Sequence, residues 1–311
     1  MNGLLRALRG RSFVLVWSGH SISLLGDRIF QVALAWWVLE ETGSAVAMGT
    51  LFIVTMIPML IFLLVGGVMV DRLPRIWLML FSDVVRGVVV GLFALLAFTD
   101  ALVLWHVYVL SLISGFVEAF FQPAYRAVIP EIVPEGDLPS ANSLSSLSGQ
   151  FSGIVGPATG AALVAVGGTP LAFALDAVSF FVSGLCLLPL WKLATSTQAK
   201  TEASSIPGEL REGLGTVTGT PWLWITIAIA GVSNIAYAGP MEVVLPFLIA
   251  DYHHADVSVL GLFYSAASVG SVIGAVWLGR LAKLRRRGVT LYGAWMIVGL
   301  MVALIGLPVP I

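Results

Sequence analysis

Two segments of the sequence carry polar side chains at the same spacing of three, four and four residues. The first set is His20, Ser23, Asp27 and Gln31. The second set is Ser111, Ser114, Glu118 and Gln122. At 3.6 residues per turn, each set falls on one stripe of a helix. If these helices cross a membrane, the two carboxylates are expensive to bury and are candidates for exchanging protons or binding cationic cargo.

The composition requires lipid as the solvent for much of this chain. Of its 311 residues, 58% are hydrophobic and 11% are charged, and the mean hydropathy is +0.98. Soluble domains carry about a quarter charged residues, so this chain has too few charges to cover its own surface. The net charge of −1 excludes a basic surface for nucleic acid. We expect a multi-pass protein of the cytoplasmic membrane.

Several classes of site are not expected. The single Cys186 excludes a disulfide framework, and no histidine has the spacing of a metal ligand. The sequence contains no Ser/His/Asp set and no Walker motif. We therefore expect no enzyme activity, no cofactor and no ATP-driven export within this chain.

A membrane-spanning helix needs about 20 predominantly apolar residues, and nine segments satisfy this requirement. They are 12–39, 45–70, 77–98, 103–123, 141–166, 170–190, 221–249, 258–279 and 289–308. The first segment is too long, and too charged at Asp27 and Arg28, for a signal peptide. The polar segment 191–220 separates six spans from three, and residues 209–218 are typical of a surface helix.

The positive charges predict the orientation. With the N-terminus in the cytoplasm, fourteen of the 16 Lys and Arg residues fall in cytoplasmic segments and none in outer segments. The other two, Arg28 and Arg86, lie within predicted spans. Either one is a potential partner of Asp27 or Glu118, and the pairing stays open at this stage.

Spans one and four run in opposite directions, so their matched stripes indicate an inverted repeat with both stripes facing one cavity. The alternative is that these residues only join helices by hydrogen bonds. Two further acids, Asp176 in span six and Glu242 in span seven, are additional candidates. A weaker stripe on span seven adds Asn234, Tyr237 and Met241 beside Glu242.

Span five has a narrow stripe of small residues with a proline in its middle. The stripe is Gly149, Gly153, Gly156 and Gly160, with Pro157 among them. Small residues let a neighbouring helix approach closely, and proline lets the helix bend. The join between spans two and three, Gly67-Val-Met-Val-Asp71-Arg72-Leu-Pro-Arg75, is a short turn that places Asp71 near a helix N-terminus.

These motifs resemble the major facilitator superfamily, in the branch of drug:proton antiporters that includes macrolide-efflux and siderophore exporters. The Gly67–Arg75 segment resembles the loop signature G-x-L-a-D-r-x-G-r, with Pro74 in place of the second glycine. Gly156-Pro157-Ala-Thr-Gly160 resembles the antiporter signature G-P-x-x-G-G, with Ala161 in place of the last glycine. Further similar segments are Gly26-Asp27, Ser82-Asp83-Val-Val-Arg86 and Gln122-Pro123-Ala124. The usual span-four arginine is absent, and Glu118 lies in that helix instead.

The resemblance implies two helical bundles that rock against each other around a central site, with twelve spans in all. We therefore expect a six-helix bundle over 1–190, a cytoplasmic linker over 191–220 and an incomplete three-helix bundle over 221–311, the sequence being C-terminally truncated. The resemblance also implies that Asp71 locks the halves at the cytoplasmic side. The residues expected to control this conformational change are Gly67, Asp71, Arg72, Arg75, Asp83, Arg86, Gly156, Pro157 and Gly160.

The expected function is export of small hydrophobic or amphipathic molecules by proton antiport, with protons, small-molecule cargo and the lipid bilayer as partners. Asp27 and Glu118 are expected to couple protons or bind a cationic substrate. The expected cavity lining is His20, Ser23, Gln31, Ser111, Ser114, Gln122, Asn234, Tyr237 and Glu242. The alternative is an inactive remnant or a membrane scaffold that does not transport. Substrate, coupling ion and oligomeric state are left open by the sequence.

Overall fold

The computed structural model describes residues 5–191, 208, 215–279 and 287–305. All regular secondary structure within these ranges is helical, which confirms the predicted all-α class. The N-terminal helices are α1 (Arg11–Thr42), α2 (Ala45–Arg72), α3 (Arg75–Phe98), α4 (Leu104–Ile132) and α5 (Leu138–Leu187). The C-terminal helices are α8 (Pro221–Ala238), α9 (Leu245–Phe247), α10 (Val257–Gly279) and α11 (Arg287–Ile305). The predicted linker lies largely outside the described residues.

The long helix α5 contains two of the predicted spans, 141–166 and 170–190. It is divided at Gly168, whose φ of 73° and ψ of 175° are not helical. A side chain at this position would be strained, so only glycine adopts this conformation readily. Pro170 lies two residues later and is suited to the first turn of the second limb. The chain reverses direction here without a separate loop.

Two predicted spans differ from the structure. The fourth was predicted to end near Pro123, but α4 continues to Ile132 because Ala124, Val128 and Ile129 pack into a buried apolar cluster. The seventh was predicted as one helix over 221–249. It is instead α8, a π-helix over Gly239–Val244, α9 and a second π-helix over Leu248–Tyr252. Pro240 and Pro246 cannot donate backbone hydrogen bonds here, and π segments often occur at functional sites.

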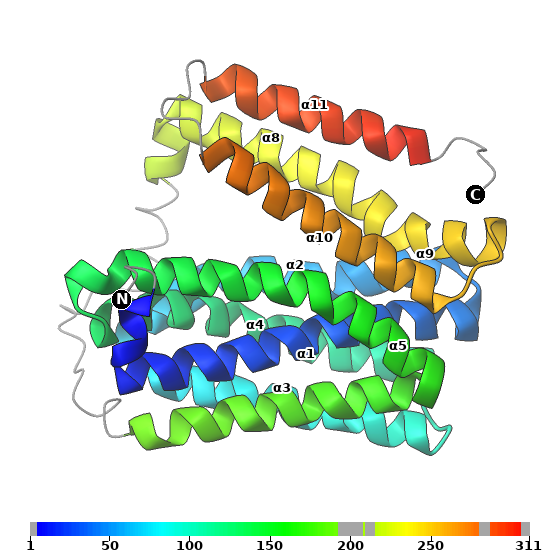
Figure 1. The fold of residues 1–311 in the computed structure, drawn as a ribbon, viewed down its shortest axis with the longest axis horizontal. Coiled ribbons are helices and arrows are strands. Elements are labelled where there is room, and N and C mark those ends of the chain that lie inside the picture. Colours follow the sequence, from blue (N-terminus) through cyan, green and yellow to red (C-terminus); the bar gives the residue numbers. More distant parts are fainter. Residues whose placement is uncertain (1–4, 192–207, 209–214, 280–286, 306–311) are drawn as a thin grey trace.

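The helices form two groups that meet at one end of the molecule. Figure 1 shows α1 to α5 in one group and α8, α10 and α11 in the other, with the groups diverging toward the end where the N-terminus lies. A buried apolar cluster joins Val32 and Leu39 of α1 to Leu245 of α9 and Leu260 of α10. The apolar cluster nearer the N-terminus consists of first-group residues only. The described structure is therefore closed at one end and open at the other.

The outer helix faces are apolar. On α2, Ile53, Ile57, Leu60 and Ile61 are each at least half exposed. Such faces suit lipid, because the helix satisfies its own backbone hydrogen bonds. The described segments long and apolar enough to cross a bilayer are Arg11–Thr42, Ala45–Phe62, Arg75–Phe98, Leu104–Ile132, Glu135–Leu190 and Val257–Val276.

Candidate functional site

A cavity of about 450 Å³ lies between α1, α2 and α4 and is bordered by Arg86 and Glu242. This volume lies within the usual range of small-molecule pockets. Its apolar wall includes Met48, Phe52, Met56 and Met59 of α2. The charged and amide side chains that line it are Asp27, Arg28, Gln31, Arg86, Glu118, Gln122 and Glu242. The cavity therefore combines a flexible, thioether-rich wall with a strongly polar wall.

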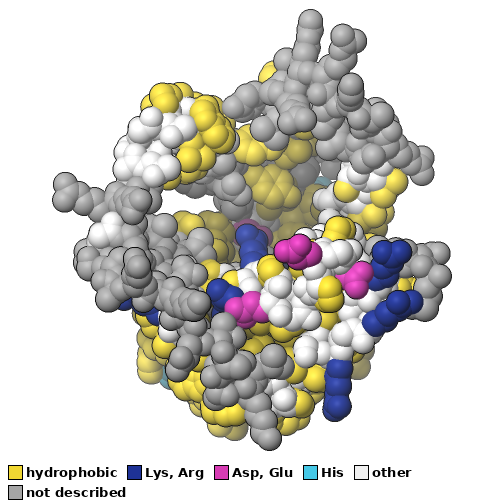
Figure 2. Space-filling model, turned by 90° about the vertical axis from the view of Figure 1, so that its left-hand side faces the viewer, with side chains coloured by type: hydrophobic (Ala, Val, Ile, Leu, Met, Phe, Trp, Pro, Cys, Tyr) yellow, Lys and Arg dark blue, Asp and Glu magenta, His cyan; other side chains and the backbone are white. Residues whose placement is uncertain are grey.

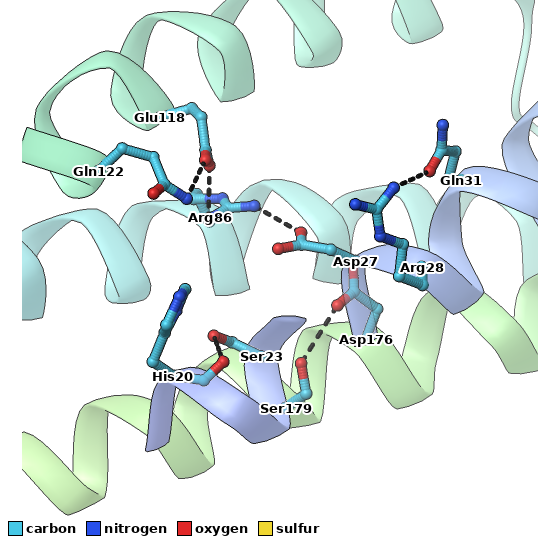
Figure 3. Close-up of polar contacts among 10 residues, drawn as sticks. All are labelled: His20, Ser23, Asp27, Arg28, Gln31, Arg86, Glu118, Gln122, Asp176 and Ser179. Atoms are coloured by element: carbon cyan, nitrogen blue, oxygen red, sulfur yellow. Dashed lines mark hydrogen bonds and ion pairs between the residues drawn. The ribbon is translucent and has the colours of Figure 1, made fainter. Parts of the chain in front are cut away.

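Arg86 is the centre of the polar wall. Its guanidinium lies 2.5 Å from Asp27 Oδ1 and 2.7 Å from Glu118 Oε2 (Figure 3). Gln122 Nε2 donates to the other oxygen of Glu118 at 3.1 Å. The pairing that the sequence left open is thus settled: one arginine of α3 bridges the acids of α1 and α4. Because all three side chains are mostly withdrawn from solvent, removing one partner leaves a poorly solvated charge.

Phe180 of α5 supports the guanidinium from behind. The Cζ atom of Arg86 lies 4.2 Å from the centre of the Phe180 ring. An arginine over an aromatic face is stabilised by the quadrupole of the ring. Arg86 of α3 therefore contacts three side chains on three other helices: Asp27 of α1, Glu118 of α4 and Phe180 of α5.

A second polar chain joins the two helical groups. Arg28 donates to Gln31 Oε1 at 3.1 Å (Figure 3), and Gln31 Nε2 lies 3.1 and 3.0 Å from the two carboxylate oxygens of Glu242. Gln31 and Glu242 are 211 residues apart in the sequence. Glu242 belongs to the first π-helical segment, so the irregular helix carries the polar contact between the groups.

A smaller cavity of about 230 Å³ adjoins this contact. Arg28, Gln31 and Glu242 line both cavities. Tyr237, predicted as cavity-lining, borders this smaller cavity together with Tyr264 of α10. The side chain of Asn234, also predicted to line a cavity, lies outside the described part of the structure.

Three predicted cavity residues are placed elsewhere. His20 packs against the rings of Tyr125 and Phe121, with centroids 4.0 and 5.3 Å away. Ser23 is buried and donates to the His20 carbonyl at 3.1 Å. Ser111 is buried as well. None of them lines the two described cavities, because neighbouring helices cover the first turns of each stripe and leave only the later turns open. Ser114 does line the larger cavity.

The residues predicted to control the conformational change lie mainly in the loop between α2 and α3 and in the glycine stripe of α5. In the loop segment, Arg75 pairs with Glu131 and also donates to the Ala127 carbonyl at 3.4 Å, so α3 is tied to the extension of α4. Gly67 has open space where a side chain would lie. Arg72 ends α2 and is partly buried. The Asp71 side chain lies outside the described residues, so its predicted locking role stays a prediction.

The glycine stripe of α5 lies between two helices. A Cβ atom on Gly156 would collide with Arg28 Cβ, and one on Gly160 would lie 2.9 Å from the Ile29 carbonyl. On the other side, a Cβ atom on Gly261 of α10 would lie 2.6 Å from the Pro157 carbonyl. The small residues thus allow α5 to approach both α1 and α10.

Two acids lie behind the ion pairs. Ser183 donates to Asp83 Oδ2 at 2.6 Å, and Ser179 donates to Asp176 Oδ1 at 3.1 Å. The sequence analysis singled out both acids but missed both serines. Ser179 and Ser183 follow Asp176 by three and seven residues, so all three side chains lie on the same face of α5. The methionine stripe of α2 was also missed, although Met48, Phe52, Met56 and Met59 follow helical spacing.

Comparison with known proteins agrees with this architecture. The chain is 24% identical to macrolide efflux protein A of Streptococcus pyogenes over 297 residues, which cover 95% of this chain and 73% of that protein. It is 27% identical to the enterobactin exporter EntS of Shigella boydii over 294 residues, covering 93% and 69%.

A solved structure has the same fold. It is a bacterial homologue of the human lysosomal transporter Spinster, in an inward-facing and unoccupied conformation, with a TM-score of 0.65 and 14% identity. The match covers 96% of this chain and 73% of that chain. Residues 16–311 match the sequence profile of the Major Facilitator Superfamily. The chain therefore belongs to the major facilitator superfamily of membrane transporters.

Proposed function

We propose that this chain exports small hydrophobic or amphipathic molecules across the cytoplasmic membrane in exchange for protons. The observation that carries the proposal is Arg86 shared between Asp27 and Glu118 on the wall of the 450 Å³ cavity. The relatives are named for export of a macrolide and of enterobactin, which are both small molecules. The apolar wall of α2 would hold the cargo, and the polar wall would sense charge.

The charge balance of this wall supports the coupling to protons. Two carboxylates share one guanidinium, so the wall carries one excess negative charge when all three groups are ionised. A proton on Asp27 or Glu118, or a cationic group of the cargo, would neutralise that excess. Proton and cargo would therefore compete for the same charge, which is the requirement for exchange.

The arrangement of the two groups supports alternating access. Figure 2 shows the open end hollowed between the groups, with arginine and acidic side chains around the opening. The positive-inside pattern supports a cytoplasmic location for this end. We propose that segments 1–190 and 221–311 rock against each other about the linker 191–220, and that Gln31 and Glu242 part when the outer end opens.

The test uses the purified chain in proteoliposomes with an imposed pH gradient and the fluorescent dyes Nile red and ethidium. We expect gradient-driven dye accumulation that a protonophore abolishes. Asp27→Asn and Glu118→Gln should each lower it by about tenfold or more, which corresponds to about 1.4 kcal/mol. Glu41→Gln is the matched control, because Glu41 is an exposed carboxylate at the end of α1.

Two results would contradict the proposal. Unchanged gradient-driven accumulation in both acid variants would remove Asp27 and Glu118 from the coupling. No accumulation by the unmodified chain, with dye binding still detectable by tryptophan quenching, would favour a membrane protein that binds without transporting.

A further inference from the structure

Asp83 and Asp176 are the most deeply buried acids in the described structure, each with 0% of its surface exposed. Each receives one hydroxyl hydrogen bond, from Ser183 and Ser179 respectively. The second oxygen of each group, Asp83 Oδ1 and Asp176 Oδ2, has no hydrogen-bond partner among the described residues. An ionised carboxylate offers about four acceptor sites, so one hydroxyl satisfies it poorly.

Neither acid forms an ion pair within the described residues. Arg86 is the nearest guanidinium in the cluster, and it is engaged by Asp27 and Glu118. If all four acids were ionised around this one arginine, the cluster would carry three excess negative charges. Buried groups in such surroundings take their neutral form instead.

The packing is tight beside Asp176 Oδ1. Gly26 of α1 lies directly against it, and a single Cβ atom at this position would collide with Asp176 Oδ1 and Ser179 Oγ. Figure 3 shows Asp176 and Ser179 on α5, next to the α1 segment that carries Asp27. In this conformation the two acids are buried between α1, α3 and α5 and do not line the cavity.

We propose that Asp83 and Asp176 are protonated in this conformation and form a proton reserve behind Arg86. The proposal rests on the proposed function and deepens it, because it adds a second pair of proton-binding groups to the exchange. The titratable and charged groups that interact in this cluster are His20, Asp27 and Arg28 of α1, Asp83 and Arg86 of α3, Glu118 of α4, and Asp176 of α5.

The geometry links the reserve to the cavity through Arg86. Asp83 lies three residues before Arg86 on α3, so their side chains share one helix face. Phe180, which supports the guanidinium, lies four residues after Asp176. When Asp27 and Glu118 are neutralised, the guanidinium turns toward Asp83 and Asp176. This movement opens the acid to water from the cavity; its O–H bond then breaks, the electron pair stays on the carboxylate oxygen, and the proton passes to that water.

Infrared difference spectroscopy of the purified chain tests this directly, since a protonated carboxyl group has a carbonyl stretch distinct from that of a carboxylate. At neutral pH we expect acid bands that are partly lost in Asp83→Asn and in Asp176→Asn. Ser179→Ala should move the Asp176 band to higher frequency, because it removes the hydrogen bond to that group. Glu41→Gln, at an exposed acid, should leave these bands unchanged.

A second variant tests the role of Arg86. In Asp27→Asn combined with Glu118→Gln, the guanidinium is released, and we expect the acid bands of Asp83 and Asp176 to weaken at the same pH. Unchanged bands in this variant would overturn the link to Arg86. Absence of acid bands assignable to Asp83 and Asp176 in the unmodified chain would overturn the reserve.

The experiments distinguish failure of the proton reserve from failure of the proposed transport function. Acid bands in a chain that moves no dye would contradict the transport function and leave the protonated pair standing. Proton-driven dye transport without the bands would do the reverse. If Asp176→Asn does not fold, the shift in Ser179→Ala decides the assignment, since that change removes only a hydroxyl.

Discussion

At the scale of single residues, Arg86 joins charges from three helices and has no equivalent substitute. Arg86→Ala would leave Asp27 and Glu118 as unpaired, poorly solvated acids, and we expect a loss of about 3 kcal/mol in the free energy of unfolding. Arg86→Lys keeps the charge but lacks the planar fork that reaches two carboxylates. It should fold better than Arg86→Ala and still transport poorly. Denaturant titration of the detergent-solubilised chain measures the first effect, and dye accumulation the second.

A double variant isolates the cause of the instability. If the unpaired acids are responsible, adding Asp27→Asn to Arg86→Ala should recover part of the lost stability. Equal stability of the single and double variants would mean that lost packing on Phe180, rather than charge, explains the effect.

The sequence predicted the residues of the polar wall better than their partners. Periodicity placed Asp27, Gln31, Glu118 and Gln122 on helix faces, and the structure has all four around one cavity. The sequence could not predict which carboxylates pair with Arg86, because that pairing depends on how three helices pack together. It also extended the stripes too far, to His20 and Ser111, since spacing does not reveal which turns a neighbouring helix covers.

At the scale of helices, close approach between α1 and α5 depends on Gly26. Gly26→Ala would force a Cβ atom into Asp176 and Ser179, and overpacking of this kind costs about 1–3 kcal/mol. Gly49→Ala is the matched control, because Gly49 lies in α2 with open space around it. The control should be neutral or slightly stabilising, since alanine favours helix. Thermal unfolding of both variants measures the difference, and equal melting temperatures would contradict the packing argument.

The lengths of the apolar segments predicted where the helices lie, but they did not predict the irregular turns within those helices. The break at Gly168 falls between two predicted spans because Gly and Pro punctuate the sequence there. The π-helices around Pro240 and Pro246 were not predicted. A proline indicates that one backbone hydrogen bond is lost, but it does not indicate which hydrogen-bond pattern the helix adopts instead. The extension of α4 past Pro123 was missed because tertiary burial of its last turns outweighs the signal from proline.

At the scale of the whole molecule, the relation between the two helical groups comes from contacts across long stretches of sequence. Composition and charge predicted a membrane bundle, and the loop signature predicted the superfamily. The closed and open ends follow from contacts such as Gln31 with Glu242, which single-sequence patterns do not encode. The proposed rocking motion therefore needs a test that acts on the interface between the groups.

The contact between α5 and α10 offers such a test. A Cβ atom on Gly153 would lie 3.4 Å from Ser268 Cβ, close to the separation of about 3.8 Å found in disulfides. We expect Gly153→Cys with Ser268→Cys, in a Cys186→Ala background, to form an intramolecular disulfide on oxidation. If the groups must separate there, oxidation should abolish dye accumulation and a reductant should restore it. Each single cysteine variant, oxidised in parallel, controls for damage. Full disulfide formation with unchanged transport would mean that α5 and α10 move as one body, and the rocking axis would then lie elsewhere.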